Sequence, residues 1–451
     1  MSAVLRAIDA LLKWAGILLI ASPLLWLVLA RIDVPLSAEA AAWLQPEPDD
    51  MPADQNAYYA FIGFYAEDAD ADINRIGRRM LEEYVERLRQ EPDLKDFKYR
   101  QEVKITGKPA ELCNPTKASC LKTARTHRVA VSRLAQDNAL LLARYRSLYR
   151  YRHYRETGPM SFYSPLPVYP GVAHDLLLAE VAQGALERPT PALEALARDV
   201  EFWRMVLRET RHVIGKAIAT RLLLADLHLL SDILASTPIR ENDDAVVKRM
   251  LRPLDAEDRS LAAAMRNEYR TVAASWPQLL HDSVGKGLEK HSALVRATVL
   301  SFASTAYRPN HTANLLHEHV AEALRAERSR AESPIAEAAA PERRRFGASV
   351  LDFLYNPAGK YFVFEAPPDM TAYSARVRDL DGFVRLVTLQ WTLRKNRTAA
   401  AGVPAFLASS TAALRDPFTG QPMNWDAGTK TLWFSRKGGR KEEKDRLEVR
   451  L

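Results

Sequence analysis

The sequence predicts a mainly α-helical protein with one N-terminal transmembrane helix, a multi-helix periplasmic body and a small α+β region at the C-terminus. Three observations predict this fold class. Glycine is scarce, at 18 of 451 residues, and 47% of the residues are hydrophobic, a balance typical of helical globular proteins. Residues 14–30 carry no charged side chain. After residue 346, turn and strand signals replace the helical periodicity of the body.

The N-terminal apolar run reads WAGILLIASPLLWLVLA over residues 14–30. With its flanking residues it provides about 22 helical residues, which span a hydrocarbon core of about 30 Å. Arg6 and Lys13 precede the run, and after Arg31 the next basic residue is Arg75. The positive-inside rule therefore predicts a single-pass protein of the bacterial inner membrane, with a cytoplasmic N-terminus and a periplasmic bulk. A cleaved signal peptide is the alternative.

Composition divides the chain into five expected segments. Residues 1–32 would hold the cytoplasmic stub and the anchor, and the proline-rich, acidic residues 33–54 would form a juxtamembrane linker. Residues 55–330 are expected to form the helical periplasmic domain. The polar, alanine-rich residues 331–345 would form a linker or exposed loop, and residues 346–451 would form the small α+β region.

Within the body, apolar periodicity and end signals predict a succession of helices. The apolar block 56–66 fits a buried strand or a helix equally well, because periodicity does not separate the two in so short a run. Asp255 and Asp258 have the spacing of a capping box at a helix start. The predicted helices cover residues 72–90, 121–154, 172–187, 190–212, 213–236, 241–252, 255–280, 285–306 and 311–331.

The C-terminal region begins with a strand candidate, KYFVFE, at residues 360–365. An amphipathic helix is expected over residues 374–396. Residues 417–436 are expected to form a turn and two short strands. The turn rests on Asp416 and Gly420 around Pro417, because proline fixes φ and glycine accepts a positive φ.

Cys113 and Cys120 are the two cysteines of the chain, and they lie close together in ELCNPTKASCL. Asn114 and Pro115 between them supply a turn that brings the two Cα atoms within disulfide range. An exported protein meets an oxidising compartment, which preserves such a bond. The sequence therefore predicts a disulfide, with two free thiols in a cytosolic protein as the alternative.

Arginine and tyrosine alternate in RYRSLYRYRHYRE at residues 144–156. Such a patch can grip phosphates or stack on bases, and outside the cytoplasm it would meet anionic lipid headgroups or cell-wall polymers. The simpler interpretation is that Tyr145, Leu148 and Tyr149 pack inward while the arginines face water. No nucleic-acid partner is expected. The candidate residues for binding an anionic surface are Arg144, Arg146, Arg150, Arg152 and Arg155.

Two patterns approach a metal site but depart from it at decisive positions. Asp68, Asp70 and Asp72 begin like a calcium loop, but the sixth position is Ile73 instead of glycine and the twelfth is Arg79 instead of glutamate. The histidines of NHTANLLHEHVAEA (residues 310–323) lack the second histidine of a zincin motif. We therefore expect no metal and no cofactor.

For catalysis the sequence offers no local signature. It contains no Gly-x-Ser-x-Gly elbow, no P-loop and no Gly-x-Gly-x-x-Gly motif. Carboxylates are too numerous and too scattered to nominate a glycosidase pair. The sequence therefore leaves the catalytic residues of a possible enzyme unknown.

The C-terminal segments carry a resemblance. The helix at 376–396, RDPFTGQPMNW at 415–425 and TLWFS at 431–435 together resemble the tail of type II secretion pseudopilins. The N-terminal run lacks the Phe-Thr-Leu-Ile-Glu type of processing motif, so the resemblance implies no filament role. The whole chain also resembles a group of proteobacterial single-pass, membrane-anchored periplasmic proteins. That second resemblance rests on the cysteine loop, Arg308-Pro309-Asn310 and Asn356-Pro357, and it implies no activity.

These observations predict a non-enzymatic, membrane-anchored periplasmic interaction or assembly protein. Its partners would be the inner membrane, through residues 14–30, and an envelope protein whose identity the sequence does not reveal. The alternative is a membrane-tethered periplasmic hydrolase acting on cell-envelope material. A cleft lined by polar residues with perturbed pKa values would favour the hydrolase, and a broad apolar or aromatic groove would favour the binding protein.

Overall fold

A computed structural model describes most of the chain after residue 30. Before that point it describes residues 13, 14, 21, 22, 25 and 28 alone. The ranges left out after residue 30 are 49–50, 68–71, 92–93, 96, 108–111, 160, 239, 288–290, 296, 298, 300–305, 333–346, 348, 350, 366–369 and 440–444.

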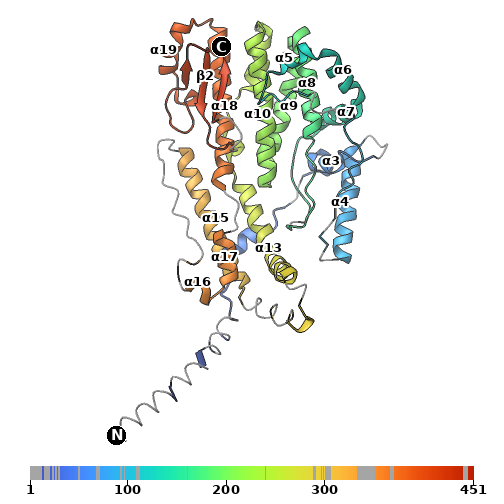
Figure 1. The fold of residues 1–451 in the computed structure, drawn as a ribbon, viewed down its shortest axis with the longest axis vertical. Helices are drawn as coiled ribbons and strands as arrows, with labels where there is room; N and C mark the ends of the chain where they lie inside the picture. The colour runs from blue at the N-terminus through green and yellow to red at the C-terminus, as the bar shows by residue number, and fades with distance from the viewer. Residues whose placement is uncertain are drawn as a thin grey trace.

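Four long helices stand side by side in the upper part of the molecule (Figure 1). They are α8 (Gly171–Glu187), α9 (Pro189–Glu209), α10 (Val213–Ser236) and α18 (Met370–Lys395). Each packs against the next, so the row runs α8–α9–α10–α18 although α18 lies far away in sequence. The helices of this row supply about half of the buried residues of the main hydrophobic core.

The predicted helix over residues 121–154 is several elements in the structure. These are α5 (Cys120–Thr126), α6 (Arg128–Asp137), α7 (Ala139–Ser147) and the short 3-10 helix η3 (Leu148–Arg150). The chain bends between them, and these bends let α5, α6 and α7 each wrap over α8. The single straight helix was therefore a wrong prediction, because packing against α8 overrides the continuous helical propensity of the segment.

The apolar block that left strand and helix open is a helix, α3 (Ala57–Gly63), paired with α4 (Ile73–Gln90). The two helices cross at Gly63 and Gly77. A Cβ atom added to Gly77 would lie 1.7 Å from the carbonyl oxygen of Tyr59, so only glycine permits this approach. Asp72 caps α4 by accepting hydrogen bonds from the backbone N–H groups at its start.

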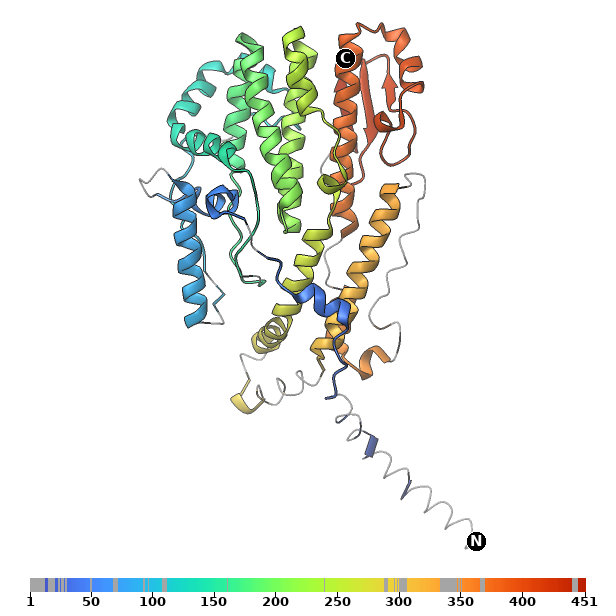
Figure 2. The same ribbon diagram turned by 180° about the vertical axis from the view of Figure 1, so that it is seen from behind.

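The lower part of the molecule is built from a second set of helices (Figures 1 and 2). They are α13 (Ala262–Gly287), α15 (Pro309–Glu332), α16 (Leu351–Leu354) and α17 (Pro357–Glu365). The short helix α12 (Ala256–Arg259), which precedes α13, packs against α9 and α18 of the upper row. The predicted capping box begins α12, with both reciprocal hydrogen bonds present. Helix α13 packs against α15, and α15 packs against α17.

Helix α17 replaces the strand predicted at residues 360–365. Pro357 opens the helix, where its fixed φ suits the first turn, and Asn356 before it has a positive φ of 52°. Val363 then faces a second hydrophobic core and is 1% exposed. That core consists mainly of Ala40, Leu261, Met265, Tyr269, Val272, Trp276, Tyr307, Leu316, Val320, Leu324, Val363 and Val377.

Residues 33–54, expected to form a linker, contain the helix α2 (Ala38–Leu44), which packs on the second core. Asp33 accepts hydrogen bonds from the backbone N–H groups of Asn310 (2.8 Å) and His311 (3.1 Å) at the start of α15. Trp43 lies edge-on to Tyr269, with ring centroids 5.7 Å apart. These contacts fix the segment as part of the fold.

The C-terminal region folds into a three-stranded antiparallel sheet of order β1-β2-β3, with β1 (Asn424–Asp426), β2 (Thr431–Ser435) and β3 (Arg446–Arg450). The sequence predicted the first two strands but not β3. The sheet covers α18, and Phe434 of β2 is fully buried against Gly382 of that helix.

The predicted turn before the sheet is confirmed in detail. Asp416 Oδ1 accepts hydrogen bonds from the backbone N–H of Phe418 (2.8 Å) and Thr419 (3.3 Å). The Gly420 N–H closes the turn onto the Asp416 carbonyl at 2.9 Å, with φ of +68° at the glycine.

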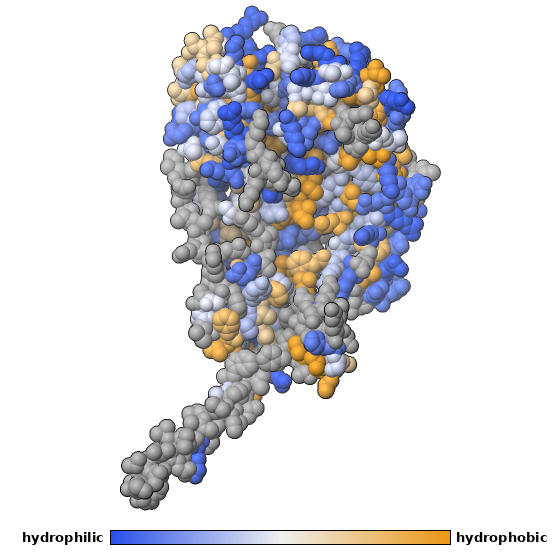
Figure 3. All heavy atoms as spheres, viewed as in Figure 1, coloured by the Kyte–Doolittle hydropathy of each residue, from blue (hydrophilic) through white to orange (hydrophobic). Residues whose placement is uncertain are grey.

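The hydropathy of the surface varies along the molecule. Figure 3 shows a largely hydrophilic top and hydrophobic residues in the middle and near the lower end of the same face.

Several short elements complete the described part of the chain. They are η1 (Ala53–Gln55), η4 (Glu241–Asp243), α11 (Asp244–Met250), η5 (Ala400–Gly402), α19 (Val403–Ala408) and η6 (Ala412–Leu414).

The predicted fold class needs one correction. The protein is mainly helical with a small antiparallel sheet, as predicted. None of the helices in the described part of the chain combines the length and the apolarity that a membrane crossing needs. The transmembrane helix predicted at residues 14–30 is therefore not found, and most of that segment lies outside the described residues.

Candidate functional site

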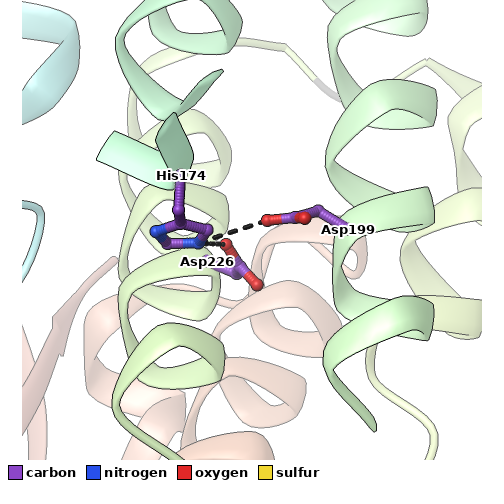
Figure 4. Close-up of side chains that lie close together, drawn as sticks. All are labelled: His174, Asp199 and Asp226. Atoms are coloured by element: carbon purple, nitrogen blue, oxygen red, sulfur yellow. Dashed lines mark hydrogen bonds and ion pairs between the residues drawn. The ribbon is translucent and has the colours of Figure 1, made fainter. Parts of the chain in front are cut away.

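Three titratable side chains from three neighbouring helices meet in the centre of the main core (Figure 4). His174 comes from α8, Asp199 from α9 and Asp226 from α10, and all three are 0% exposed. His174 Nε2 lies 2.8 Å from Asp226 Oδ1 and 3.2 Å from Asp199 Oδ2. We call these three residues the His–Asp–Asp cluster.

The surroundings of the cluster are apolar. Leu178 and Leu196 lie on the same helices as His174 and Asp199, and Leu223 and Leu230 flank Asp226 on α10; all four are buried. An isolated charge is costly in such an environment, so these side chains are stable there only as a paired group.

The electrostatics of the cluster follow from burial and mutual proximity. Burial alone would lower the pKa of His174, but the Asp226 and Asp199 carboxylates outweigh it, so this pKa is raised well above its ordinary value. Burial, reinforced by the neighbouring Asp199, raises the pKa of Asp226 well above its ordinary value. Both shifts favour bound protons, which keep the net charge of the cluster small.

Two tyrosines hold Asp199 in place. The hydroxyls of Tyr145 and Tyr149 donate to Asp199 Oδ1 at 2.8 and 3.1 Å. Trp203 Nε1 donates in turn to the Tyr145 hydroxyl at 2.7 Å. Burial, and next the Asp199 carboxylate, raise the pKa of both tyrosines, so both remain protonated donors. The chain of donors fixes the orientation of Asp199.

In the part of the chain that the structure describes, the His–Asp–Asp cluster is a group of side chains that could hold a metal ion. Each residue offers one ligand atom, and the three atoms lie within 4.8 Å of one another. Sequence spacing could not reveal it, because its members come from three different helices. The signal that was present is a polar residue inside an apolar helical stretch, such as Asp226 within the leucine-rich α10.

A cleft of about 650 Å³ opens beside the cluster, between α7, η3 and α9. Its lining includes the guanidinium groups of Arg146, Arg150 and Arg198. Aromatic rings of Tyr149, Tyr151 and Phe202 complete much of the wall. Tyr149 therefore links the cleft to the His–Asp–Asp cluster. Its ring lines the cleft, and its hydroxyl donates a hydrogen bond to Asp199.

The five arginines predicted as an anionic-surface patch are divided by the fold. Arg146 and Arg150 line the cleft, where Arg146 pairs with Glu180 and Arg150 pairs with Asp72 at 2.9 Å. Arg144 is 4% exposed, and its Nη1 donates to two backbone carbonyl oxygens of the segment after α3, each at 2.7 Å.

The remaining two arginines, Arg152 and Arg155, follow η3, and their backbone N–H groups bond to residues 55 and 56. The five side chains therefore do not share one surface. Binding of an anionic surface by this segment stays a prediction. Neither of the two metal-like sequence patterns forms a metal site of its own. Asp72 caps α4, the first two aspartates of its run lie outside the described residues, and the histidine pattern of residues 310–323 lies within α15 (Pro309–Glu332).

A second cavity of about 580 Å³ lies where α13 and α15 meet the segment after α2. Glu47 lines it and bridges Arg211 Nη2 at 2.7 Å and Arg270 Nη2 at 2.8 Å. Burial would raise the pKa of Glu47, but its hydrogen bond from Arg270 and the charge of Arg211 lower it. Glu47, Arg211 and Arg270 at this cavity are therefore already paired with one another.

The predicted disulfide between Cys113 and Cys120 is present, with Cα atoms 5.3 Å apart. Cys120 begins α5 and is 1% exposed, so the bond is anchored in the main core. Ser119 caps α5 and also donates to Asp232 of α10. The bond therefore fixes the start of the helices that cover α8.

The comparisons with known proteins add no relative from which a function could be transferred. No protein-family model, no curated protein and no solved structure matches the chain.

Proposed function

We propose that the protein is a non-enzymatic binding protein, and that the cleft between α7, η3 and α9 takes an organic anion with an aromatic or apolar body. The observation that carries this proposal is the combination of three guanidinium groups and three aromatic rings around one cleft of about 650 Å³. This volume lies within the range of about 300–1,000 Å³ that is usual for small-molecule sites.

Arg198 is the guanidinium that would bind the anionic group. Arg146 and Arg150 have carboxylate partners, Glu180 and Asp72. Arg198 is exposed and has no ion-pair partner among the residues that the structure describes. A planar guanidinium binds carboxylate or phosphate oxygens in pairs, which gives both affinity and orientation.

The aromatic wall would bind the apolar body of the ligand. Tyr149 is held by Asp199, and the Tyr151 hydroxyl accepts a hydrogen bond of 2.8 Å from Arg150. The rings of Tyr149 and Phe202 lie 6.1 Å apart at 63°. Since hydrogen bonds and packing already restrict these rings, a ligand would lose less free energy in ordering them.

Binding is favoured over the hydrolase alternative because of access. Tyr149 lines the cleft with a strongly raised pKa, but it is a protonated donor already bound to Asp199, and the other strongly shifted groups, His174 and Asp226, are 0% exposed. Tyr149 separates them from the cleft. A substrate in the cleft would not reach a proton donor or acceptor of the cluster.

The disulfide supports an oxidising compartment as the place where this binding occurs. Bonds such as Cys113–Cys120 form and persist in such compartments and are rare where thiols are kept reduced. We therefore propose that the ligand is met outside the reducing cytoplasm.

The experiment compares two probes that differ in charge alone, naphthoate and its neutral amide, by saturation-transfer NMR with the full chain. Naphthoate should bind at least about tenfold more tightly, because a charge-assisted hydrogen bond contributes about 1.5–3 kcal/mol. Arg198→Ala should abolish this preference, and Arg198→Lys should restore part of it.

Arg188→Ala serves as the matched control, since Arg188 is an exposed arginine between α8 and α9 outside the cleft. This variant should bind naphthoate like the unaltered protein. Equal binding of the acid and the amide, or unchanged binding after Arg198→Ala, would refute the proposal.

A further inference from the structure

We infer that the His–Asp–Asp cluster is a binding site for one divalent transition-metal ion of the zinc type, held by His174 Nε2 and one oxygen each of Asp199 and Asp226. This inference does not depend on the cleft or on its ligand.

The first support is the convergence of three ligand atoms. Nε2 lies 2.8 Å from Asp226 Oδ1 and 3.2 Å from Asp199 Oδ2. Ligands that each lie about 2.0–2.2 Å from a tetrahedral zinc ion are separated from one another by roughly 3.3–3.6 Å. The 3.2 Å separation is close to that range, and the 2.8 Å separation is about half an ångström shorter, so the His174 and Asp226 side chains must move apart to admit the ion.

The second support is an oxygen that the protein leaves without a donor. The Nε2 proton of His174 can point at one acceptor, and Asp226 Oδ1 at 2.8 Å is the better placed. Asp199 Oδ2 faces the same nitrogen but has no hydrogen-bond partner, and Asp226 Oδ2 also has none. Both oxygens are fully buried, where an unsatisfied polar atom is costly. A proton on Asp226 can join one pair of carboxylate oxygens, whereas a divalent cation binds one oxygen of each aspartate and the imidazole nitrogen at once.

The third support is the orientation of the ligands by groups around them. Tyr145 and Tyr149 bind the other oxygen of Asp199, which leaves Oδ2 directed at His174. His174 Nδ1 lies 3.8 Å from Asp175 Oδ1, which is too long for a hydrogen bond, so the orientation by outer contacts applies to Asp199 and not to the imidazole. Hydrogen bonds to the ligating carboxylate are outer contacts that metal sites use to orient their ligands.

Charge and ligand type select the ion. Two carboxylates and one neutral imidazole carry a charge of −2, which a divalent cation neutralises in a core that tolerates little net charge. A set of one imidazole and two carboxylates suits zinc and its neighbours, whereas calcium and magnesium prefer oxygen ligands alone. Both aspartates and the imidazole must be deprotonated to bind, so metal binding would release the protons that the cluster otherwise keeps.

The test uses the purified full chain, stripped with a chelator and then dialysed against zinc chloride. Elemental analysis should find one zinc per chain, and zinc should raise the unfolding midpoint. Asp226→Asn has the same shape as the native side chain but lacks its charge, and it should weaken zinc binding at least about tenfold. His317→Gln removes a histidine outside the cluster and should retain the metal.

A readout on the unaltered protein covers the case in which Asp226→Asn does not fold. X-ray absorption at the zinc edge should show one imidazole and otherwise oxygen ligands. A protein that keeps no zinc after dialysis would overturn the inference and leave the cluster as a proton-sharing group. A zinc shell with several imidazoles, or full zinc retention by a folded Asp226→Asn variant, would also overturn it.

Discussion

Lys216 provides the sharpest test of the electrostatics of this fold. It lies near the start of α10 and is 2% exposed. Burial is the main reason why its pKa falls from 10.5 to about 8. The acidic groups around it, Asp258 of α12, Glu327 of α15 and Glu156, oppose this shift without cancelling it, and Arg208 of α9 adds to it.

The lowered pKa has a definite consequence for stability. Below about pH 8, Lys216 is protonated in both the folded and the unfolded chain, so its contribution to the pH dependence is zero. Between about pH 8 and pH 10.5, the folded chain has lost the proton and the unfolded chain has kept it. The free energy of unfolding therefore rises with pH, by about 3 kcal/mol across the whole window.

Lys216→Met removes this effect while keeping a long apolar side chain. Urea unfolding followed by circular dichroism at about pH 7 and about pH 9.5 should show a rise of about 2 kcal/mol in the unaltered protein relative to the variant. Higher pH is avoided, because tyrosines of the unfolded chain ionise near pH 10.

Lys122→Met provides the control, since Lys122 is an exposed lysine of α5 and its removal should leave the slope unchanged. If the unaltered protein and Lys216→Met show the same change with pH, Lys216 is not desolvated in the way the structure implies.

Three further predictions concern packing and the covalent bond. Phe434→Ala should lower the free energy of unfolding by about 3–5 kcal/mol, because the ring is fully buried on α18. Chemical denaturation measures this loss, and a value below about 1 kcal/mol, typical of a surface site, would contradict the prediction. Gly77→Ala should destabilise by about 1–3 kcal/mol through the clash with the Tyr59 carbonyl, seen as a lower melting midpoint, and an unchanged midpoint would count against the close crossing. Joint replacement of Cys113 and Cys120 by serine should cost about 2–3 kcal/mol but leave a folded protein with an unchanged far-ultraviolet spectrum.

Local signals in the sequence predicted local structure well. The capping box at Asp255 and the turn at Asp416 were predicted because their hydrogen bonds join residues a few positions apart. The disulfide was predicted for the same reason. In each case the interacting residues lie within a short stretch of chain, so the rest of the fold does not change the local conformation.

Prediction failed where distant packing decides the conformation. KYFVFE has the composition of a strand, yet it forms a helix because Pro357 starts a turn and Val363 faces the second core. Strand β3 was missed because Leu447 and Val449 alternate with charged residues in a short segment. The segment becomes a strand through its pairing with β2, which the local sequence does not show.

The His–Asp–Asp cluster was missed for a related reason. Its residues are single polar positions in three separate helices, and nothing in a linear sequence says that three such positions coincide. The Arg–Tyr segment was noticed, but the fold divides its arginines between the core, the cleft and the chain that follows η3. The packing of α7 on α8 and of η3 on α9 decides which of them share a site.

Helix α18 has a consequence for how the molecule behaves as a whole. Its Val377 belongs to the second core, while its buried apolar residues between Leu380 and Leu393 belong to the main core. One continuous helix therefore contributes to both cores. Neither core can melt without uncovering part of this helix, and the two should therefore unfold in one transition. Amide protons of α18 should exchange with solvent only through that global opening, more slowly than those of peripheral helices such as α6. A cut of the chain between the cores would leave both fragments with an uncovered apolar face and a tendency to aggregate.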